Sequence, residues 1–290
     1  MRVRHVVTAF LKDHSKGRML LGQRSDRVGT YPGHWAAISG SVEDCSPPEQ
    51  AFTEISEETG LEADQVDLRG EGLPVRFVDW DLETRWVVHP FLFHCREPKA
   101  VRRDWEHVRF QWVDPGRIGE FQTVPHLKEA WEAASLAERE GGYPRPETLF
   151  ERVEADREHG AEELGLQVLA GLRYQLLRCE GQSPAEIKDS FREACSRAAR
   201  LRPSMAPVLS GALEAWSLLE PESEEPGPDA AEGIRERIEK RERATLEAAR
   251  RAADLIAPGS ALVTLSYSST VLCVLSEARE RISTLYVAES

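Results

Sequence analysis

Three glutamates in the first half of the chain have the spacing of a metal-binding helix face. Glu54, Glu57 and Glu58 stand at positions i, i+3 and i+4, so helical geometry places their carboxylates one turn apart on one side. Like charges this close destabilise an isolated helix by about 0.2–0.5 kcal/mol per pair. A hard cation reverses that effect, and Mg²⁺ binds through a few carboxylates together with substrate phosphates. The pattern predicts a Mg²⁺ site, with Mn²⁺ as an alternative ion.

The residues on either side define the helix that carries these glutamates. Ser46 suits the N-cap, Pro47 the first helical position, and Glu49 the closing position of a capping box. Gly60 marks the helix end. Residues 35–42 are predicted to form a strand that runs into the loop before the helix. Loop carbonyls and helix carboxylates can then converge on one ion. The alternative is an acidic helix face that meets only solvent.

Residues 54–61, EISEETGL, resemble the second half of the Nudix box, G-x5-E-x7-R-E-U-x-E-E-x-G-U, where U is aliphatic. Every position of that half agrees. The first half differs from the box. Thr53 occupies the position of the arginine, Cys45 that of the glutamate and Ser39 that of the leading glycine, and Gly40 comes one position late. In the family, that arginine and glutamate brace the loop against the helix. We therefore expect the brace to have been lost as a pair, with the metal-ligand half intact.

The resemblance covers about residues 1–135 and implies a Nudix domain over residues 1–140, an α/β sandwich with a mixed sheet between helices. It implies a Mg²⁺-dependent hydrolase that cleaves a pyrophosphate bond in a nucleoside diphosphate linked to another group. Glu57 and Glu58 would ligate the metal, and Glu54 would ligate it or orient the attacking water. Gly40 is expected to contact the substrate.

Side chains outside the box are candidates to complete the site. Glu106, at the start of the last predicted strand, is a candidate catalytic base or further metal ligand, and His107 is a weaker one. Both could instead form the polar rim of that strand. Arg24, Arg27 and Arg76 could clamp phosphates, because a guanidinium matches phosphate geometry bidentately. Arginine is so frequent in this chain that a surface position is favoured for each of them taken alone.

Composition narrows the class of protein. A length of 290 residues suggests two domains of ordinary size. The net charge of −13 disfavours general binding to nucleic-acid backbones. No apolar run is long enough to span a bilayer, and the N-terminal segment is too short and polar for a signal peptide. The five cysteines lack metal-type spacing, which fits reduced thiols in a cytoplasmic protein.

Hydrophobic periodicity and turn residues predict the elements of both halves. In the first half we expect strands over 3–12, 19–21, 35–42, 74–80, 84–95 and 106–115, then a helix over 124–140. Residues 141–147 have the composition of a linker. In the second half we expect helices over 148–179, 183–200, 205–219 and 230–256, an acidic loop over 221–227, and a strand, helix and strand over 261–265, 271–279 and 282–287.

Three segments of the second half resemble the initiation factor 2B alpha/beta/delta family, which includes sugar-phosphate isomerases. They are DREHGAEELGLQVLAGL (156–172), RPSMAP (202–207) and LVTLSYSSTVLCVL (262–275). The resemblance implies a helical domain over 148–257 and the start of a Rossmann-like domain over 258–290. Two strands and one crossover cannot bury both faces of a parallel sheet. We therefore expect that the chain ends inside this domain, or that a partner completes the sheet.

A hydroxyl-rich loop in this second domain precedes a predicted helix and is a candidate phosphate cradle. Ser266, Ser268, Ser269 and Thr270 lie where a strand ends and a helix begins. The alternative is an N-cap cluster without a ligand. In the related isomerases a catalytic cysteine stands at the position of Ser266, and a hydroxyl does not replace a thiol of low pKa. Isomerase activity is therefore not expected.

Two functions of different classes remain. The first is the Nudix hydrolase, with a second domain that binds a sugar phosphate or nucleotide or assembles a homo-oligomer. The second is a non-catalytic nucleotide-sensing regulator, or a protein like initiation factor 2B, in which the Nudix domain only binds. Cleavage of a nucleotide panel in the presence of Mg²⁺ discriminates between them.

Overall fold

The computed structural model describes residues 2–219, 226–265 and 268–288. The chain divides into two compact units, with the boundary between Pro144 and Arg145. The first unit contains the acidic helix, and the second contains the helices and strands that come after Pro144. No helix among the described residues has both the length and the apolar character needed to cross a membrane.

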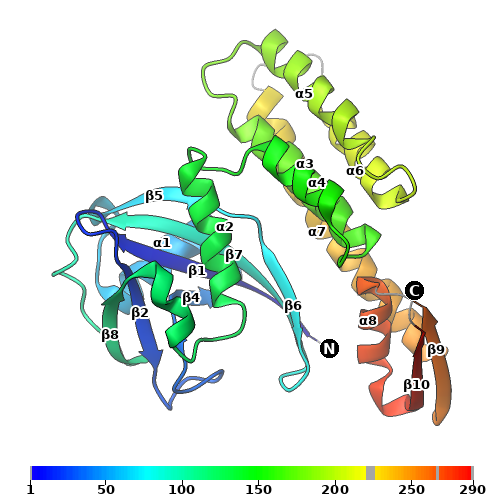
Figure 1. Cartoon of the computed structure of the whole chain (residues 1–290), viewed down its shortest axis with the longest axis horizontal. Coiled ribbons are helices and arrows are strands. Elements are labelled where there is room, and N and C mark those ends of the chain that lie inside the picture. Colours follow the sequence, from blue (N-terminus) through cyan, green and yellow to red (C-terminus); the bar gives the residue numbers. More distant parts are fainter. Residues whose placement is uncertain (1, 220–225, 266–267, 289–290) are drawn as a thin grey trace. The chain divides into compact units, whose positions relative to one another are not determined.

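One mixed, eight-stranded sheet forms the centre of the first unit (Figure 1). Its strands are β1 (Arg2–Asp13), β2 (Met19–Arg24), β3 (Trp35–Ala36), β4 (Ile38–Ser41), β5 (Val66–Glu71), β6 (Val75–Asp79), β7 (Thr84–Cys95) and β8 (His107–Val113). Strands β1 and β7 run parallel in the middle. β4 pairs with β1, and β6 pairs with β7, both antiparallel. The strands β4, β1, β7 and β6 therefore lie side by side.

Helices α1 (Pro47–Thr59) and α2 (Leu127–Arg139) cover opposite faces of the sheet (Figure 1). Alternation along β1 explains this, since Val7, Ala9 and Leu11 pack in the core cluster on the α1 side. Phe10 packs with residues of α2 instead. A strand buried on both faces belongs between two layers, and the predicted sandwich is confirmed.

Two details of the first unit differ from the prediction. The strand expected over 35–42 is divided at Ala37, because β3 pairs with β2 whereas β4 pairs with β1. Strand β5 was not predicted. Its sequence, VDLRGE, is polar and does not alternate, and its pairing with β7 holds it in the sheet. Tertiary pairing outweighs local pattern in both places.

The second unit begins with a helical bundle. Its helices are α3 (Pro146–Ala155), α4 (Ala161–Leu177), α5 (Pro184–Ala198), α6 (Ala206–Ser217) and α7 (Pro226–Asp254). The single helix expected over 148–179 is wrong: Asp156 ends the first helix, and its Oδ1 accepts the backbone N–H groups of Glu158 and His159. Gly160 then caps α4. The acidic loop predicted over 221–227 lies mostly outside the described residues, and α7 begins earlier than expected.

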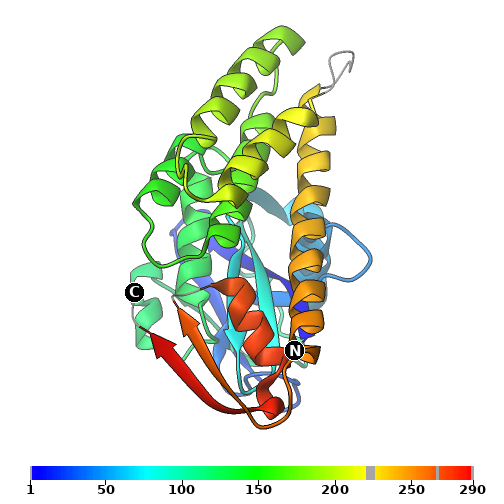
Figure 2. The ribbon, with the colours of Figure 1, turned by 90° about the vertical axis from the view of Figure 1, so that its right-hand side faces the viewer.

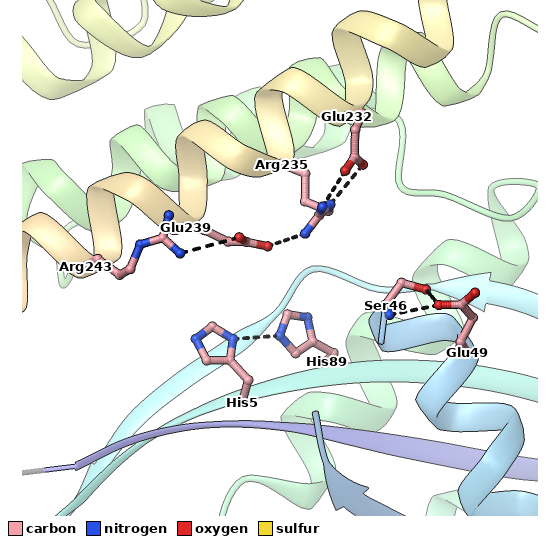
Figure 3. A network of polar contacts seen from close by, with 8 residues as sticks. All are labelled: His5, Ser46, Glu49, His89, Glu232, Arg235, Glu239 and Arg243. Atoms are coloured by element: carbon pink, nitrogen blue, oxygen red, sulfur yellow. Dashed lines mark hydrogen bonds and ion pairs between the residues drawn. The ribbon is translucent and has the colours of Figure 1, made fainter. Parts of the chain in front are cut away.

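Helix α7 is supported by charged pairs along its own surface (Figure 3). Arg235 pairs with Glu232 and Glu239, three and four residues away, and Arg243 pairs with Glu239. Pairs at this spacing each stabilise a helix by about 0.2–0.5 kcal/mol.

The chain then forms a parallel strand–helix–strand unit of β9 (Ser260–Leu265), α8 (Ser269–Glu277) and β10 (Ile282–Ala288). Helix α8 packs against α7 (Figure 2). One side of β9 stays open, since Val263 is 72% and Leu265 is 73% exposed. The predicted helical region and small parallel sheet are confirmed.

Candidate functional site

Helix α1 begins and ends where its sequence predicts. The Glu49 carboxylate accepts hydrogen bonds from Ser46 N at 2.9 Å and Ser46 Oγ at 2.7 Å (Figure 3). Pro47 occupies the first turn. Gly60 closes the helix in the left-handed conformation, with φ 67°, and donates its N–H to Ser56 O. The acidic residues are thus fixed on a helix with two defined ends.

A cavity of about 360 Å³ lies beside the predicted metal-binding residues. Glu54 and Glu57 from α1 line it, together with Gly40 from β4, Glu106 and Arg24. The volume lies at the lower end of the range for small-molecule sites, about 300–1,000 Å³. The structure therefore brings five of the predicted site residues to one cavity.

Glu54 is held closely against the backbone of β4. A Cβ atom on Gly40 would fall 1.6 Å from Glu54 Oε1, so only glycine leaves room for this carboxylate. Gln50 Nε2 donates to the same oxygen at 2.7 Å. Burial raises the pKa of Glu54, the hydrogen bond from Gln50 lowers it, and the charges of Glu57 and Glu106 raise it. The net direction is upward.

The pKa of Glu106 is also raised, by burial and by neighbouring negative charges. Burial raises its pKa first, then the charge of Asp104; Arg24 lowers the pKa, and Glu57 raises it further. Carboxylates that oppose each other's ionisation across a cavity are suited to a divalent cation, which supplies the missing positive charge. The oxygen donors of Glu54 and Glu57 are of the type that Mg²⁺ and Mn²⁺ prefer, and Glu106 lines the same cavity.

Among residues 2–219, 226–265 and 268–288, no three His, Cys, Asp or Glu side chains already form a closed metal-binding group. Glu57 is exposed, so its side chain is free to change rotamer.

Glu58 is placed differently from its two neighbours. Its residue is 3% exposed, and Oε1 accepts the Ser39 N–H at 3.1 Å. Oε2 is buried without a hydrogen bond among the described residues and lies 3.5 Å from His107 Nε2. Burial raises the pKa of Glu58 well above its ordinary value. This carboxylate ties the helix to the strand before it. Unlike Glu54 and Glu57, Glu58 does not line the cavity.

His107 is a core residue of this region. It is 1% exposed, and its Nδ1 lies 3.0 Å from Asp104 Oδ1. Burial lowers its pKa, although Asp104 acts in the opposite direction. His107 does not line the cavity, so its position favours a supporting role for Glu58.

The three arginines are distributed around the first unit. Arg24 lines the cavity and donates from Nε to Thr30 O at 3.0 Å. Arg76 does not line it, and its Nη1 donates to Pro74 O. Arg27 lies 5.3 Å from the Trp105 ring centroid, a cation–π distance. Of these three, Arg24 alone lines the cavity and can meet a phosphate there. Arg4, which the sequence analysis did not single out, lines the cavity as well.

An aromatic part of the cavity was missed by the sequence analysis. Tyr31, Phe77, Trp86 and His126 all line it. The ring centroids of Phe77 and His126 lie 4.3 Å apart, with the ring planes tilted by 31°. Phe77 is the direct cross-strand partner of Trp86. The register of the β6–β7 hairpin would have placed Phe77 beside Trp86, but nothing local in the sequence marks Tyr31 or His126.

Tyr31 and His126 share an unusual backbone. Their φ angles are 50° and 57°, in the left-handed region that few non-glycine residues adopt. The Tyr31 hydroxyl donates to Asp79, and burial followed by this contact raises its pKa well above the ordinary value. Such backbone conformations persist only where the surroundings determine them, often at binding sites.

The hydroxyl-rich loop of the second unit is described only in part. Ser266 lies outside the described residues. Ser268 is the N-cap of α8, and its side chain accepts the Val271 N–H at 3.4 Å. Ser269 and Thr270 form the first turn of α8. Ser268 therefore forms the N-cap that is the alternative to a phosphate-binding loop. Phosphate binding by this loop stays a prediction.

Comparison with family models divides the chain as the two resemblances did. Residues 2–137 match the model of the NUDIX domain. Residues 157–290 match the model of the Initiation factor 2 subunit family. Both resemblances are confirmed.

Individual relatives cover only part of the chain. The octanoyltransferase of Myxococcus xanthus is 33% identical over 121 residues, which are 39% of this chain and 31% of that protein. The chain thus spans about a third of the length of this curated relative.

Two solved structures give likenesses of limited extent. The MutT protein from Methanosarcina mazei Go1 is 25% identical, with a TM-score of 0.36 over 46% of this chain and 94% of that chain. The dihydroneopterin triphosphate pyrophosphohydrolase of E. coli is 21% identical, with a TM-score of 0.38 over 48% of this chain and 97% of that chain. The domain assignment therefore rests on the family models.

Proposed function

We propose that this chain, a Nudix domain followed by a domain of the initiation factor 2 subunit family, hydrolyses a pyrophosphate bond with Mg²⁺. Its substrate class would be a nucleoside diphosphate linked to another group. The observation that carries this proposal is the cavity of the first unit, which joins Glu54, Glu57 and Glu106 to a set of aromatic side chains.

The layout of the sheet separates the two parts of that cavity. Gly40, against which Glu54 packs, belongs to β4, whereas Phe77 belongs to β6. Strands β1 and β7 lie between them. Three strand spacings amount to about 14 Å, and the paired positions of Gly40 and Phe77 are offset by three residues along β7, which is about 10 Å. A substrate with its diphosphate at the carboxylates and its base at the rings would bridge the two parts. Base–aromatic stacking is worth about 1–3 kcal/mol.

Each charged side chain has a role in this arrangement. Glu54 and Glu57 would hold the cation, with the orphaned oxygen of Glu58 as a further ligand. When bound, Mg²⁺ supplies Lewis-acid activation of the diphosphate and the attacking water. Glu106, whose pKa is raised by burial, would accept the proton of that water, since a base works best with a pKa near the operating pH. Arg24 would neutralise phosphate charge.

The direct test is a panel of nucleoside diphosphate derivatives incubated with the full chain and Mg²⁺. We expect cleavage of at least one member into two phosphate monoesters, and loss of that cleavage on addition of EDTA. If no member is cleaved but one binds with Mg²⁺, the non-catalytic nucleotide sensor is the better account.

The aromatic side chains of the cavity are predicted to contribute to substrate binding. Phe77→Ala should raise KM about 5- to 100-fold and leave kcat nearly unchanged, because it removes stacking that ground and transition states share. Phe77→Tyr keeps a ring and should stay close to wild type. Trp80 is a matched control, since it is 47% exposed and does not line the cavity. Equal KM values for Phe77→Ala and Trp80→Ala would place the base elsewhere.

A further inference from the structure

The loop before α1 is still connected to the helix, through residues that the Nudix box does not specify. We infer that Gln50, held by Cys45, positions Glu54 and takes over the task of the missing arginine–glutamate brace. This inference rests on the proposed function, because it concerns the carboxylate that would hold the cation. Gln50 is a positioning residue in this account, since it touches Glu54 and does not line the cavity.

Two hydrogen bonds form the connection. Cys45 Sγ donates to Gln50 Oε1 at 3.0 Å, and Gln50 Nε2 donates to Glu54 Oε1 at 2.7 Å. Gln50 and Glu54 are four residues apart on α1, a spacing at which side chains meet. An amide has a donor end and an acceptor end, so one side chain can link a loop thiol to a helix carboxylate. We call this series Cys45–Gln50–Glu54 the thiol–amide link.

The link and Gly40 act on the same carboxylate oxygen. Glu54 Oε1 lies against the Gly40 backbone, where a Cβ would come within 1.6 Å, while Oε2 would be 2.7 Å from that Cβ. Gln50 donates to Oε1. The two contacts fix the orientation of the carboxyl group and leave Oε2 without a hydrogen bond from Gln50. An oriented carboxylate binds a metal more tightly than a mobile one, because less freedom is lost on binding.

Thr53 does not take part, although it stands at the arginine position of the box. Its hydroxyl donates to Glu49 O at 3.1 Å, one turn back on its own helix, and the residue is exposed. The arginine and glutamate of the box are both missing here, and Gln50, one turn before Thr53 on α1, takes their place in this account. Thr53 supplies a matched control on the same helix.

The first experiment measures Mn²⁺ binding to the full chain by electron paramagnetic resonance, without substrate. Gln50→Leu keeps the approximate side-chain size but removes the amide. We expect its Mn²⁺ Kd to rise about 10- to 100-fold, the usual cost of removing a residue that orients a metal ligand. Thr53→Val should bind Mn²⁺ as wild type does. The melting temperatures of both variants report on folding. If Gln50 had only a structural role, Gln50→Leu would lower the melting temperature.

Cys45 tests the other end of the thiol–amide link. Cys45→Ala should weaken Mn²⁺ binding about two- to fivefold, as expected for one neutral hydrogen bond. Cys45→Ser restores a donor and should recover most of the affinity. In the Gln50→Leu background, Cys45→Ala should have no further effect, because the link is already broken. An equal effect of Cys45→Ala in both backgrounds would overturn the link.

The outcomes separate this inference from the proposed function. Wild-type affinity in Gln50→Leu, together with normal Mn²⁺ binding by the wild type, would overturn the positioning role and leave the metal site intact. Absence of Mn²⁺ binding in the wild type itself would overturn both. A 10-fold or greater loss in Gln50→Leu at unchanged melting temperature, with recovery in Cys45→Ser, would support the link.

Discussion

Glu57→Gln is expected to lose at least about 100-fold in kcat while the fold is retained. Removing a residue that only orients a metal ligand already costs about 10–100-fold, and Glu57 is proposed as a ligand itself. The side chain is exposed and lies near Glu54, so neutralising it relieves repulsion between carboxylates. The melting temperature without metal should therefore stay the same or rise. Steady-state kinetics at saturating Mg²⁺ and thermal unfolding check both parts.

Glu43→Gln is the control for this variant. Glu43 is an exposed carboxylate in the loop before α1 and does not line the cavity. It should keep wild-type kcat, which shows that one unit of surface charge is not enough to explain the loss. Unchanged turnover in Glu57→Gln would remove Glu57 from the site.

Gly40→Ala is expected to reduce kcat about 100-fold with little effect on stability. The new Cβ would overlap Glu54 Oε1 at 1.6 Å, and the carboxylate is the free end of a flexible side chain that can move. The fold therefore accommodates the change, but the carboxylate is displaced by about 1 Å or more, and such misplacement can cost about 100-fold. Kinetics and thermal unfolding of the same sample measure the two effects.

Gly119→Ala provides the matched glycine control. A Cβ at Gly119 would meet nothing within 4 Å, so both activity and melting temperature should match the wild type. If Gly40→Ala is as active as Gly119→Ala, Glu54 does not need its present position, and its role as a ligand would have to be abandoned.

The acidic helix was the part of the site that the sequence specified best. Ser46, Pro47 and Gly60 are local signals, and each acts within one turn of its own position. The glutamate spacing is also local, so the face that α1 presents could be predicted. Burial is not local: Glu57 is exposed whereas Glu58 is buried against His107, although they are adjacent in the chain.

The remaining features depend on contacts between distant segments. The aromatic part of the cavity combines β6, β7, the loop before β3 and the start of α2, and no short window contains them. Strand β5 depends on β7 for its pairing. In the sequence, nothing distinguishes Gln50 from other polar helix residues, and its contact with Cys45 is seen only in the structure. Tertiary contacts decide each of these, and a single sequence does not display them.

The central claim is that the carboxylates beside Gly40 hold a divalent cation. Anomalous diffraction from crystals of the full chain soaked in Mn²⁺ tests it most directly. We predict a strong anomalous peak within bonding distance of Glu54 and Glu57 oxygens, in the cavity that Glu106 also lines, and its loss in crystals of Glu57→Gln. At saturating Mn²⁺, a cavity without a peak, or a peak unchanged in Glu57→Gln, would contradict the account.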